Sequence, residues 1–176
     1  MAWPERGAGS HAPAQRAGTN GVRAVELIAT GGVLLRPPCG SFDDAVGGLV
    51  DTLIGSACLA AAMRDSAIRA VIGREALAST AIVEIGVAVP HARVEGVEGV
   101  IAALAASPGG LYYAMASVPI SVMVIVLSAP ELIGEHLNTL AGVSLLLQSA
   151  AVRRGLEHAA DSESALHLLR GGNGRG

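Results

Sequence analysis

The spacing of apolar residues predicts two amphipathic helices in the first half of the chain. From Asp43 to Cys58, apolar side chains recur every three or four residues, the period of a helix that buries one face. Ser41 precedes this segment as a candidate N-cap, and aspartates occupy the first turn, where the helix dipole favours negative charge. A second helix is expected from about Met63 to Ala78, with its charged residues largely on the sides away from its apolar positions.

Short apolar runs in the middle of the chain indicate buried strands. Gly86–Pro90 is expected to be one short strand, and Pro90 should end it or place it at a sheet edge, because proline has no N–H donor. Further strands are expected at Val97–Ala106 and Ile120–Leu127, where continuous apolar residues are typical of strands covered on both faces.

The last third of the chain returns to helical spacing. A helical region opens at Pro130, and a last helix is expected from about Ser149 to Leu169, with a break near Asp161. Near the other end, residues 22–35 are typical of a short helix or turn followed by a strand. Helices at both ends with strands between them predict an α/β fold, a layered sandwich with a central mixed β-sheet flanked by helices on both faces.

The two ends of the chain are expected to lie outside this domain. Residues 1–21 are rich in Ala, Gly, Pro and Arg, and they lack the apolar run of a signal peptide, so a disordered leader is expected there. Residues 171–176 are expected to form a disordered tail. A single domain over residues 22–170 follows.

Composition excludes several classes of protein. The chain has 176 residues, 51% of them hydrophobic and 2% aromatic, so it is too apolar for a disordered protein and its core is built from aliphatic side chains. Its formal net charge is -3, and nucleic-acid binding usually needs a basic face. All twelve basic residues are arginines, which excludes Schiff-base chemistry and phosphate binding by lysine.

The charge-free stretch from Gly99 to Pro130 raises the possibility of a membrane span. Prolines and glycines at Pro108–Gly110 and at Pro119 divide it into runs shorter than the roughly 20 residues that a spanning helix needs. No integral membrane span is therefore expected, and solubility of the purified chain without detergent would dispose of that alternative. The only cysteines, Cys39 and Cys58, are too few for a disulfide framework and are expected to be reduced thiols of a cytoplasmic protein.

His91 is the histidine with the most informative position. His11 falls in the expected leader, and His158 and His167 fall in the polar terminal helix. His91 directly follows the apolar run Gly86–Pro90, and a strand end on a rigid sheet is a common place for functional groups. A neutral imidazole there can act as a nucleophile. Spacing alone nevertheless favours a capping or core role for His91.

Two blocks of sequence resemble a known family. The residues REALAST at Arg74–Thr80, followed by GVAVPHAR at Gly86–Arg93, resemble the signature of the fructose/mannitol-type enzyme IIA domain of the bacterial phosphoenolpyruvate-dependent sugar phosphotransferase system, which includes a nitrogen-regulatory branch. The residues LSAP at Leu127–Pro130, followed by Glu135–Leu137 and a leucine-rich helix, resemble the second histidine block of that family. The resemblance covers about residues 24–170.

The resemblance implies a phosphoryl relay without a metal or an organic cofactor. His91 matches the phosphoacceptor, which would take a phosphoryl group from the histidine phosphocarrier protein and pass it to an enzyme IIB or hold it as a signal for regulatory target proteins. His136 matches the second active-site histidine, Arg74 the nearby arginine, and Thr80 lies in the matching loop as a phosphate-binding candidate. Arginine suits this chemistry because its fixed fork of donors fits phosphate oxygens.

Other interpretations of these residues stay open at this stage. Arg74 is also explained as a solvated charge at a helix end, and His136 as a histidine on a helix face. The loop before His91 departs from the family pattern, since it is one residue longer and carries Glu84 near a site for a dianion. A degenerate, non-transferring binding module with the same fold is therefore the alternative to a phosphotransferase component. The apolar stretch Gly109–Ser117, with Tyr112 and Tyr113, is a further departure.

Overall fold

Two fully buried antiparallel strands form the centre of the protein. The computed structural model describes residues 13–115 and 118–172. Strands β5 (Val100–Ala106) and β8 (Val122–Ser128) pair from Val100 opposite Ser128 to Ala106 opposite Val122, and every residue in both strands is buried. Continuous apolar sequence suits this position, because each face of the pair is covered by helices.

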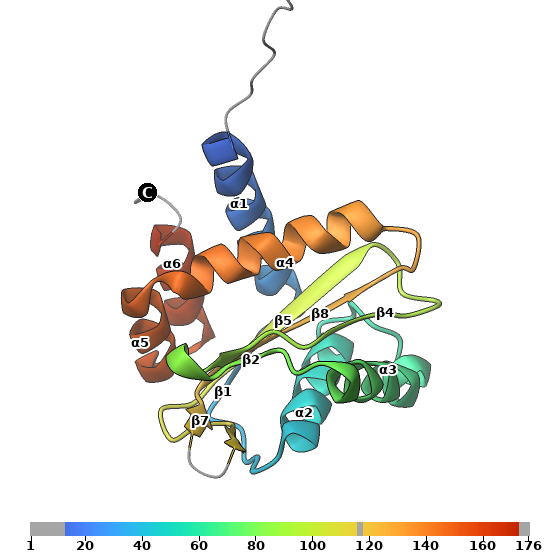
Figure 1. Cartoon of the computed structure of the whole chain (residues 1–176), viewed down its shortest axis with the longest axis horizontal. Helices are drawn as coiled ribbons and strands as arrows, with labels where there is room; N and C mark the ends of the chain where they lie inside the picture. Colours follow the sequence, from blue (N-terminus) through green and yellow to red (C-terminus); the bar gives the residue numbers. More distant parts are fainter. Residues whose placement is uncertain (1–12, 116–117, 173–176) are drawn as a thin grey trace, which may run out of the picture.

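The remaining strands extend this pair into a mixed sheet of six strands (Figure 1). Strand β1 lies parallel to β5 on one side, while β3 and β4 both lie parallel to β8 on the other, and β2 pairs antiparallel with β3. A separate two-stranded hairpin is formed by β6 and β7. The bounds of these strands are β1 (Val33–Leu35), β2 (Ala81–Ile82), β3 (Val87–Ala88), β4 (His91–Arg93), β6 (Tyr112–Ala114) and β7 (Val118–Ile120).

Helices cover both faces of the sheet, as the sequence predicted. Alternate residues of β5 and β8 point into two separate apolar clusters. One cluster is closed by α2 and α3, and the other by α1, α4, α5 and α6 (Figure 1). The helices are α1 (Pro13–Gly31), α2 (Phe42–Gly55), α3 (Arg64–Leu77), α4 (Ile133–Gln148), α5 (Ala150–His158) and α6 (Ser162–Gly172), with 3-10 turns η1 (Ala61–Met63) and η2 (Val83–Ile85).

Local signals place most element boundaries where they were expected. The side chain of Ser41 caps α2 by accepting a hydrogen bond from the backbone N–H of Asp44 at 3.1 Å. The terminal helix breaks near Asp161, whose carboxylate accepts a hydrogen bond from the N–H of Ser164. The strand expected at Gly86–Pro90 is interrupted at Val89–Pro90, since Pro90 has no N–H donor, and it continues as β4. No helix of the described residues is long and apolar enough to cross a membrane.

Three expectations differ from the structure. The leader was predicted to be disordered to Gly21, but α1 begins at Pro13; the rest of that prediction, residues 1–12, lies outside the described residues, as do residues 173–176 of the tail. The strand expected from Val97 begins at Val100, because Gly96 and Gly99 adopt positive φ angles in the preceding turn. The strand expected at Ile120–Leu127 begins at Val122, since Ile120 is the last residue of β7 in a β6–β7 hairpin that was not predicted.

Helix α1 is held against α4 by close packing. Ala24, Val25 and Ile28 of α1 are buried, and the two helices contact each other along much of their length. Gly142 of α4 faces the backbone of α1, where a Cβ atom would overlap the carbonyl of Asn20. This contact explains why the helix extends into the predicted leader, since tertiary packing stabilises a segment that is unremarkable in sequence.

The close approach at Gly142 predicts a loss of stability on adding one methyl group. Gly142→Ala should lower the free energy of unfolding by about 1–3 kcal/mol, because backbone cannot move aside as a flexible side chain can. Gly134→Ala is the matched control in the same helix, where a Cβ meets nothing within 4 Å. Urea denaturation should find Gly134→Ala at least as stable as the native protein, and equal stability of the two variants would contradict this account.

Candidate functional site

His91 is the first residue of β4, and its ring is held by the backbone beside it. Nδ1 of His91 lies 2.9 Å from the carbonyl oxygen of Val89, and the side chain is half-buried. A carbonyl oxygen only accepts hydrogen bonds, so Nδ1 must carry the proton in this contact. In the neutral ring, Nε2 is then the nitrogen with a free lone pair. The local backbone therefore fixes which nitrogen of His91 is nucleophilic.

His136 lies in the first turn of α4, next to the end of β8. Its ring is buried, with 6% of the residue exposed, and Nδ1 lies 2.8 Å from Oγ of Ser128, the last residue of β8. Only a short loop separates β8 from α4, so the strand end and the helix start are close together. With Nδ1 engaged, Nε2 is the ring nitrogen of His136 that remains free for another partner.

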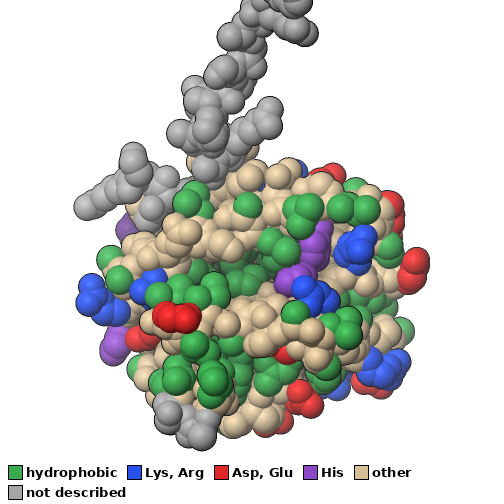
Figure 2. All heavy atoms as spheres, viewed as in Figure 1, with side chains coloured by type: hydrophobic (Ala, Val, Ile, Leu, Met, Phe, Trp, Pro, Cys, Tyr) green, Lys and Arg blue, Asp and Glu red, His purple; other side chains and the backbone are tan. Residues whose placement is uncertain are grey.

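The structure brings the two predicted histidines together. The ring centroids of His91 and His136 lie 5.4 Å apart, with the ring planes at 59°. The rings are tilted and do not stack face to face. Figure 2 shows histidine and arginine side chains gathered on this face, beside a recess with hydrophobic side chains on its floor.

The surroundings of His136 favour its neutral form. Burial is the main cause that lowers its pKa from the ordinary value of 6.5, and the positive charges of His91 and Arg93 lower the pKa further. A neutral His136 can donate one hydrogen bond from Nε2 when Nδ1 acts as an acceptor.

Arg93 is a site residue that the sequence reasoning did not single out. It lies two residues after His91 at the end of β4, opposite Ser128, and its Nη1 donates a hydrogen bond to the carbonyl oxygen of Pro130 at 3.3 Å. Its guanidinium is exposed and close enough to affect the pKa of His136. The signal that could have found Arg93 is the period of two along a strand, which places it on the same face as His91.

Arg74 and Thr80 lie on elements that neighbour the histidine pair. Arg74 is in the last turn of α3, a helix that contacts β4, and its Nη1 donates to the carbonyl oxygen of Ala78 at 3.3 Å. Within residues 13–115 and 118–172, no hydrogen bond or ion pair joins Arg74 or Thr80 to either histidine. Their predicted roles stay predictions.

Glu75 organises the loop that carries Thr80. Its carboxylate accepts hydrogen bonds from the backbone N–H and the hydroxyl of Thr80, at 2.8 and 2.7 Å, and from the hydroxyl of Ser79 at 2.8 Å. The carbonyl of Thr80 in turn accepts a hydrogen bond from the N–H of Val89, the residue whose own carbonyl holds His91. The Thr80 hydroxyl is therefore an anchor of the loop, and Glu75 is a residue that the sequence reasoning missed.

The two departures from the family pattern involve Glu84 in a turn and Tyr112 in the hairpin. Glu84 lies exposed in the turn η2, which ends at Gly86 with a φ of 66°, and it is not among the charges that shift the pKa of His136. Tyr112 of the hairpin is buried edge-on against Phe42. Burial, together with the charge of Glu75, raises the pKa of Tyr112 to about 12.

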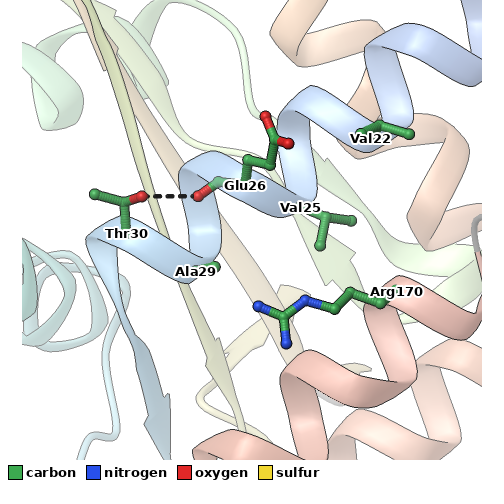
Figure 3. A pocket seen from close by; sticks show the side chains of 6 residues that line it. All are labelled: Val22, Val25, Glu26, Ala29, Thr30 and Arg170. Carbon is green, nitrogen blue, oxygen red and sulfur yellow. Dashed lines mark hydrogen bonds between the residues drawn. The ribbon is translucent and has the colours of Figure 1, made fainter.

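Polar groups elsewhere among the described residues form no second group of adjacent histidines. A hollow of about 570 Å³ lies between α1 and α6 (Figure 3), and neither His91 nor His136 is among the residues that line it. Glu26, Thr30 and Arg170 contribute its polar groups, and the Thr30 hydroxyl is used by the carbonyl of Glu26. No group of three or more histidine, cysteine or acidic side chains in the described ranges could hold a metal ion. His158 is exposed and bonded to its own helix, and His11 lies outside the described residues.

Comparison with known proteins gives one family match and several similar solved structures. The family model "Phosphoenolpyruvate-dependent sugar phosphotransferase system, EIIA 2" matches residues 34–171, which excludes α1. No curated protein matches the chain. The solved structure of the nitrogen regulatory protein IIA-Ntr from Neisseria meningitidis is similar with a TM-score of 0.65 and 23% identity, covering 82% of this chain and 97% of that chain.

Two solved structures from Escherichia coli have the same fold. The complex of enzyme IIAMTL with phosphorylated enzyme IIBMTL matches with a TM-score of 0.64 and 18% identity, over 80% of this chain and 95% of that chain. The mannitol-specific cryptic phosphotransferase enzyme IIA CmtB matches with a TM-score of 0.64 and 18% identity, over 84% of this chain and 97% of that chain. At these identities the similarity establishes the fold.

The environment of His136 predicts a measurable titration. In an NMR titration, the His136 ring should change protonation at a pH below 6.5, and Arg93→Gln should raise that midpoint by removing a positive charge. Arg154→Gln, a change on the exposed surface of α5, is the matched control and should leave it unchanged. A midpoint at or above 6.5 would contradict the lowered pKa of His136.

The lowered pKa of His136 also predicts how stability depends on pH. Because the unfolded chain takes up this proton more readily than the folded chain, the free energy of unfolding should fall as the pH drops below 6.5.

Proposed function

The chain belongs to the EIIA 2 family of the phosphoenolpyruvate-dependent sugar phosphotransferase system, and from this premise we propose that it is a phosphocarrier that accepts a phosphoryl group on His91. The observation that carries the proposal is the pair of adjacent imidazoles, in which the Val89 carbonyl leaves Nε2 of His91 free as the nucleophile. The donor is the histidine phosphocarrier protein, and the phosphoryl group passes to an enzyme IIB or is held as a signal.

The transfer needs no proton from the site before attack. Nε2 of His91 attacks the phosphorus atom of the donor phosphohistidine, a nitrogen–phosphorus bond forms on His91, and the nitrogen–phosphorus bond of the donor breaks with its electron pair returning to the donor ring. Nδ1 of His91 keeps its proton, and the positive charge of the phosphorylated ring is stabilised by the Val89 carbonyl. In the second transfer, a nucleophilic atom of the acceptor protein attacks the phosphorus atom on His91. The nitrogen–phosphorus bond of His91 then breaks, and its electron pair returns to Nε2.

Positioning and charge stabilisation are the tasks left to the protein, as in phosphoryl transfer generally. His136 donates a hydrogen bond from Nε2 to an equatorial phosphate oxygen. Arg93 offers positive charge from the end of β4, and Arg74 offers four further N–H donors beyond the one it gives to Ala78. Thr80 orders the loop before β2 through Glu75 and is a weaker candidate for phosphate contact.

Exposed apolar side chains beside the site suit docking of a protein partner. Ile133 and Leu137 flank His136 on α4 and are 54% and 60% exposed, and Leu77 follows Arg74 at the end of α3 with 84% exposed. Large apolar groups gathered around a reactive centre are typical of interaction surfaces. A related solved structure is a complex of enzyme IIAMTL with phosphorylated enzyme IIBMTL. These observations support a relay between cytoplasmic proteins.

A degenerate binding module is the second candidate function. The observation in its favour is the loop before His91, where the hydroxyl of Thr80 is bound by Glu75, and, in the part of the chain that the structure describes, Arg74 makes no hydrogen bond or ion pair with either ring. Such a module would keep the fold and bind regulatory targets by contact alone. Phosphorylation of His91 separates the two candidates.

A reconstituted relay tests the proposed function. With phosphoenolpyruvate, enzyme I and the histidine phosphocarrier protein, intact mass should show one acid-labile phosphoryl group on the native chain and none on His91→Ala. His158→Ala is the matched control, an exposed helix histidine that should be phosphorylated like the native protein. A folded native chain that takes up no phosphoryl group, beside an active control enzyme IIA, would contradict the proposal and favour the binding module.

Arg74 should affect the rate of transfer and not the fold. Arg74→Gln removes a charged donor from the side of the site and should slow phosphorylation of His91 by about 10- to 100-fold, the effect of one hydrogen bond to a charged group. Arg69→Gln, an exposed change on the same helix, is the control and should transfer at the native rate. Equal rates for the two variants in rapid-quench kinetics would contradict a part for Arg74 in the transfer and would leave it as a solvated charge at a helix end.

A further inference from the structure

The hydroxyl of Ser128 is a buried polar group beside His136. Ser128 is fully buried at the end of β8, where it pairs with Val100 of β5 and with Arg93 of β4. Its carbonyl oxygen also accepts a hydrogen bond from the N–H of Val94 at 2.9 Å. The backbone of Ser128 is therefore held from both sides, and rotation about the Cα–Cβ bond is the only large freedom of its hydroxyl.

This hydroxyl is in contact with His136. Oγ of Ser128 lies 2.8 Å from Nδ1 of His136, and both groups are buried. If the hydroxyl donates to Nδ1, its proton is satisfied inside the protein. If Nδ1 donates instead, the hydroxyl proton needs a second acceptor, and no other hydrogen bond of this hydroxyl is found among the described residues. Burial makes an unsatisfied proton costly, so the hydroxyl donates.

We propose that Ser128 is a positioning residue for this site, whose hydroxyl fixes the ring of His136 so that Nε2–H is the donor presented to a phosphoryl group on His91. The proposal rests on the proposed function of His91. Without the hydroxyl, the His136 ring is free to rotate about its broad second side-chain torsion and to exchange its two nitrogens. A lone pair would then replace the donor beside the phosphate oxygens for part of the time.

The charges around His136 are consistent with this role. His91 and Arg93 face it from β4, and both disfavour a proton on both ring nitrogens. Glu135, the adjacent residue of α4, is paired with Arg23 of α1, so its negative charge is offset. A neutral ring has one donor only, and the direction of that donor is what Ser128 determines.

The first readout tests the position of the ring without any phosphoryl transfer. Long-range proton–nitrogen NMR of the unphosphorylated full chain should show His136 with its proton on Nε2 and an acceptor-type shift at Nδ1. Ser128→Ala should move the Nδ1 signal of His136 towards a free nitrogen. Thr139→Ala is the matched control, because it removes a buried hydroxyl of α4 that donates only to the carbonyl of Glu135. Native nitrogen shifts in Ser128→Ala would overturn the proposal.

The second readout measures the consequence for phosphoryl transfer with a small donor. Phosphoramidate transfers its phosphoryl group when its phosphorus–nitrogen bond breaks, a bond forms between phosphorus and Nε2 of His91, and ammonia leaves. Ser128→Ala should be phosphorylated about twofold to tenfold more slowly, the effect of one neutral hydrogen bond. Ser128→Thr keeps the hydroxyl and should restore much of the rate, and Thr139→Ala should match the native chain.

The two readouts separate failure of this inference from failure of the proposed function. A native chain that accepts no phosphoryl group from phosphoramidate or from the relay contradicts the proposed function, while the NMR result still decides whether Ser128 positions His136. Phosphorylation of Ser128→Ala at the native rate, or an equal loss in Ser128→Ala and Thr139→Ala, would overturn the role of Ser128. Circular dichroism of each variant confirms that the compared chains are folded.

Discussion

The site depends on one interaction, the parallel pairing of β4 with the end of β8. This register places His91 opposite Val126 and Arg93 opposite Ser128. The interruption at Val89–Pro90 sets up the pairing, because the carbonyl of Pro90 accepts the N–H of Val126 and the carbonyl of Val89 is free to hold the His91 ring. A shift of one residue would turn His91 to the opposite face of the sheet and away from His136.

The buried centre of the sheet gives this pairing its rigidity. β8 is bonded to β5 along its whole length and is covered by an apolar cluster on each face, so its end at Ser128 is a fixed point. Helix α4 starts a few residues later and brings His136 back over that end. The loop that Glu75 holds also fixes the chain before His91, because the carbonyl of Thr80 in that loop accepts a hydrogen bond from the N–H of Val89. A rigid scaffold with reactive groups at its rim suits a reaction that depends on positioning.

The sequence predicted the layers of the fold because its patterns are strong where burial is complete. The continuous apolar runs that became β5 and β8 and the period of α2 leave little choice of structure. Helix α1 was missed over residues 13–21 because its stability comes from contact with α4, which no local pattern shows. The β6–β7 hairpin was missed for a related reason, since its short strands are stabilised by packing of Tyr112 on Phe42.

Some residues of the candidate site were predicted from the sequence, and others were found only in the structure. His91 and His136 were predicted from motifs, and the structure places their rings side by side. The carbonyl of Val89 holds His91 from two residues away, the hydroxyl of Ser128 reaches His136 across the loop between β8 and α4, and strand register places Arg93 opposite Ser128; no local pattern shows these contacts. Thr80 was chosen for its place in a motif, and its hydroxyl proved to be bound by Glu75. Motifs thus identify the reacting groups, and pairing identifies the groups that orient them.

The most direct measurement of the central claim is the identity of the phosphorylated nitrogen. In the phosphorylated full chain labelled with nitrogen-15, NMR should show coupling between phosphorus and Nε2 of His91, with Nδ1 of the same ring still protonated towards Val89. That result would confirm that the backbone selects the nucleophile. Coupling to Nδ1 of His91, or to a ring other than His91, would contradict the account.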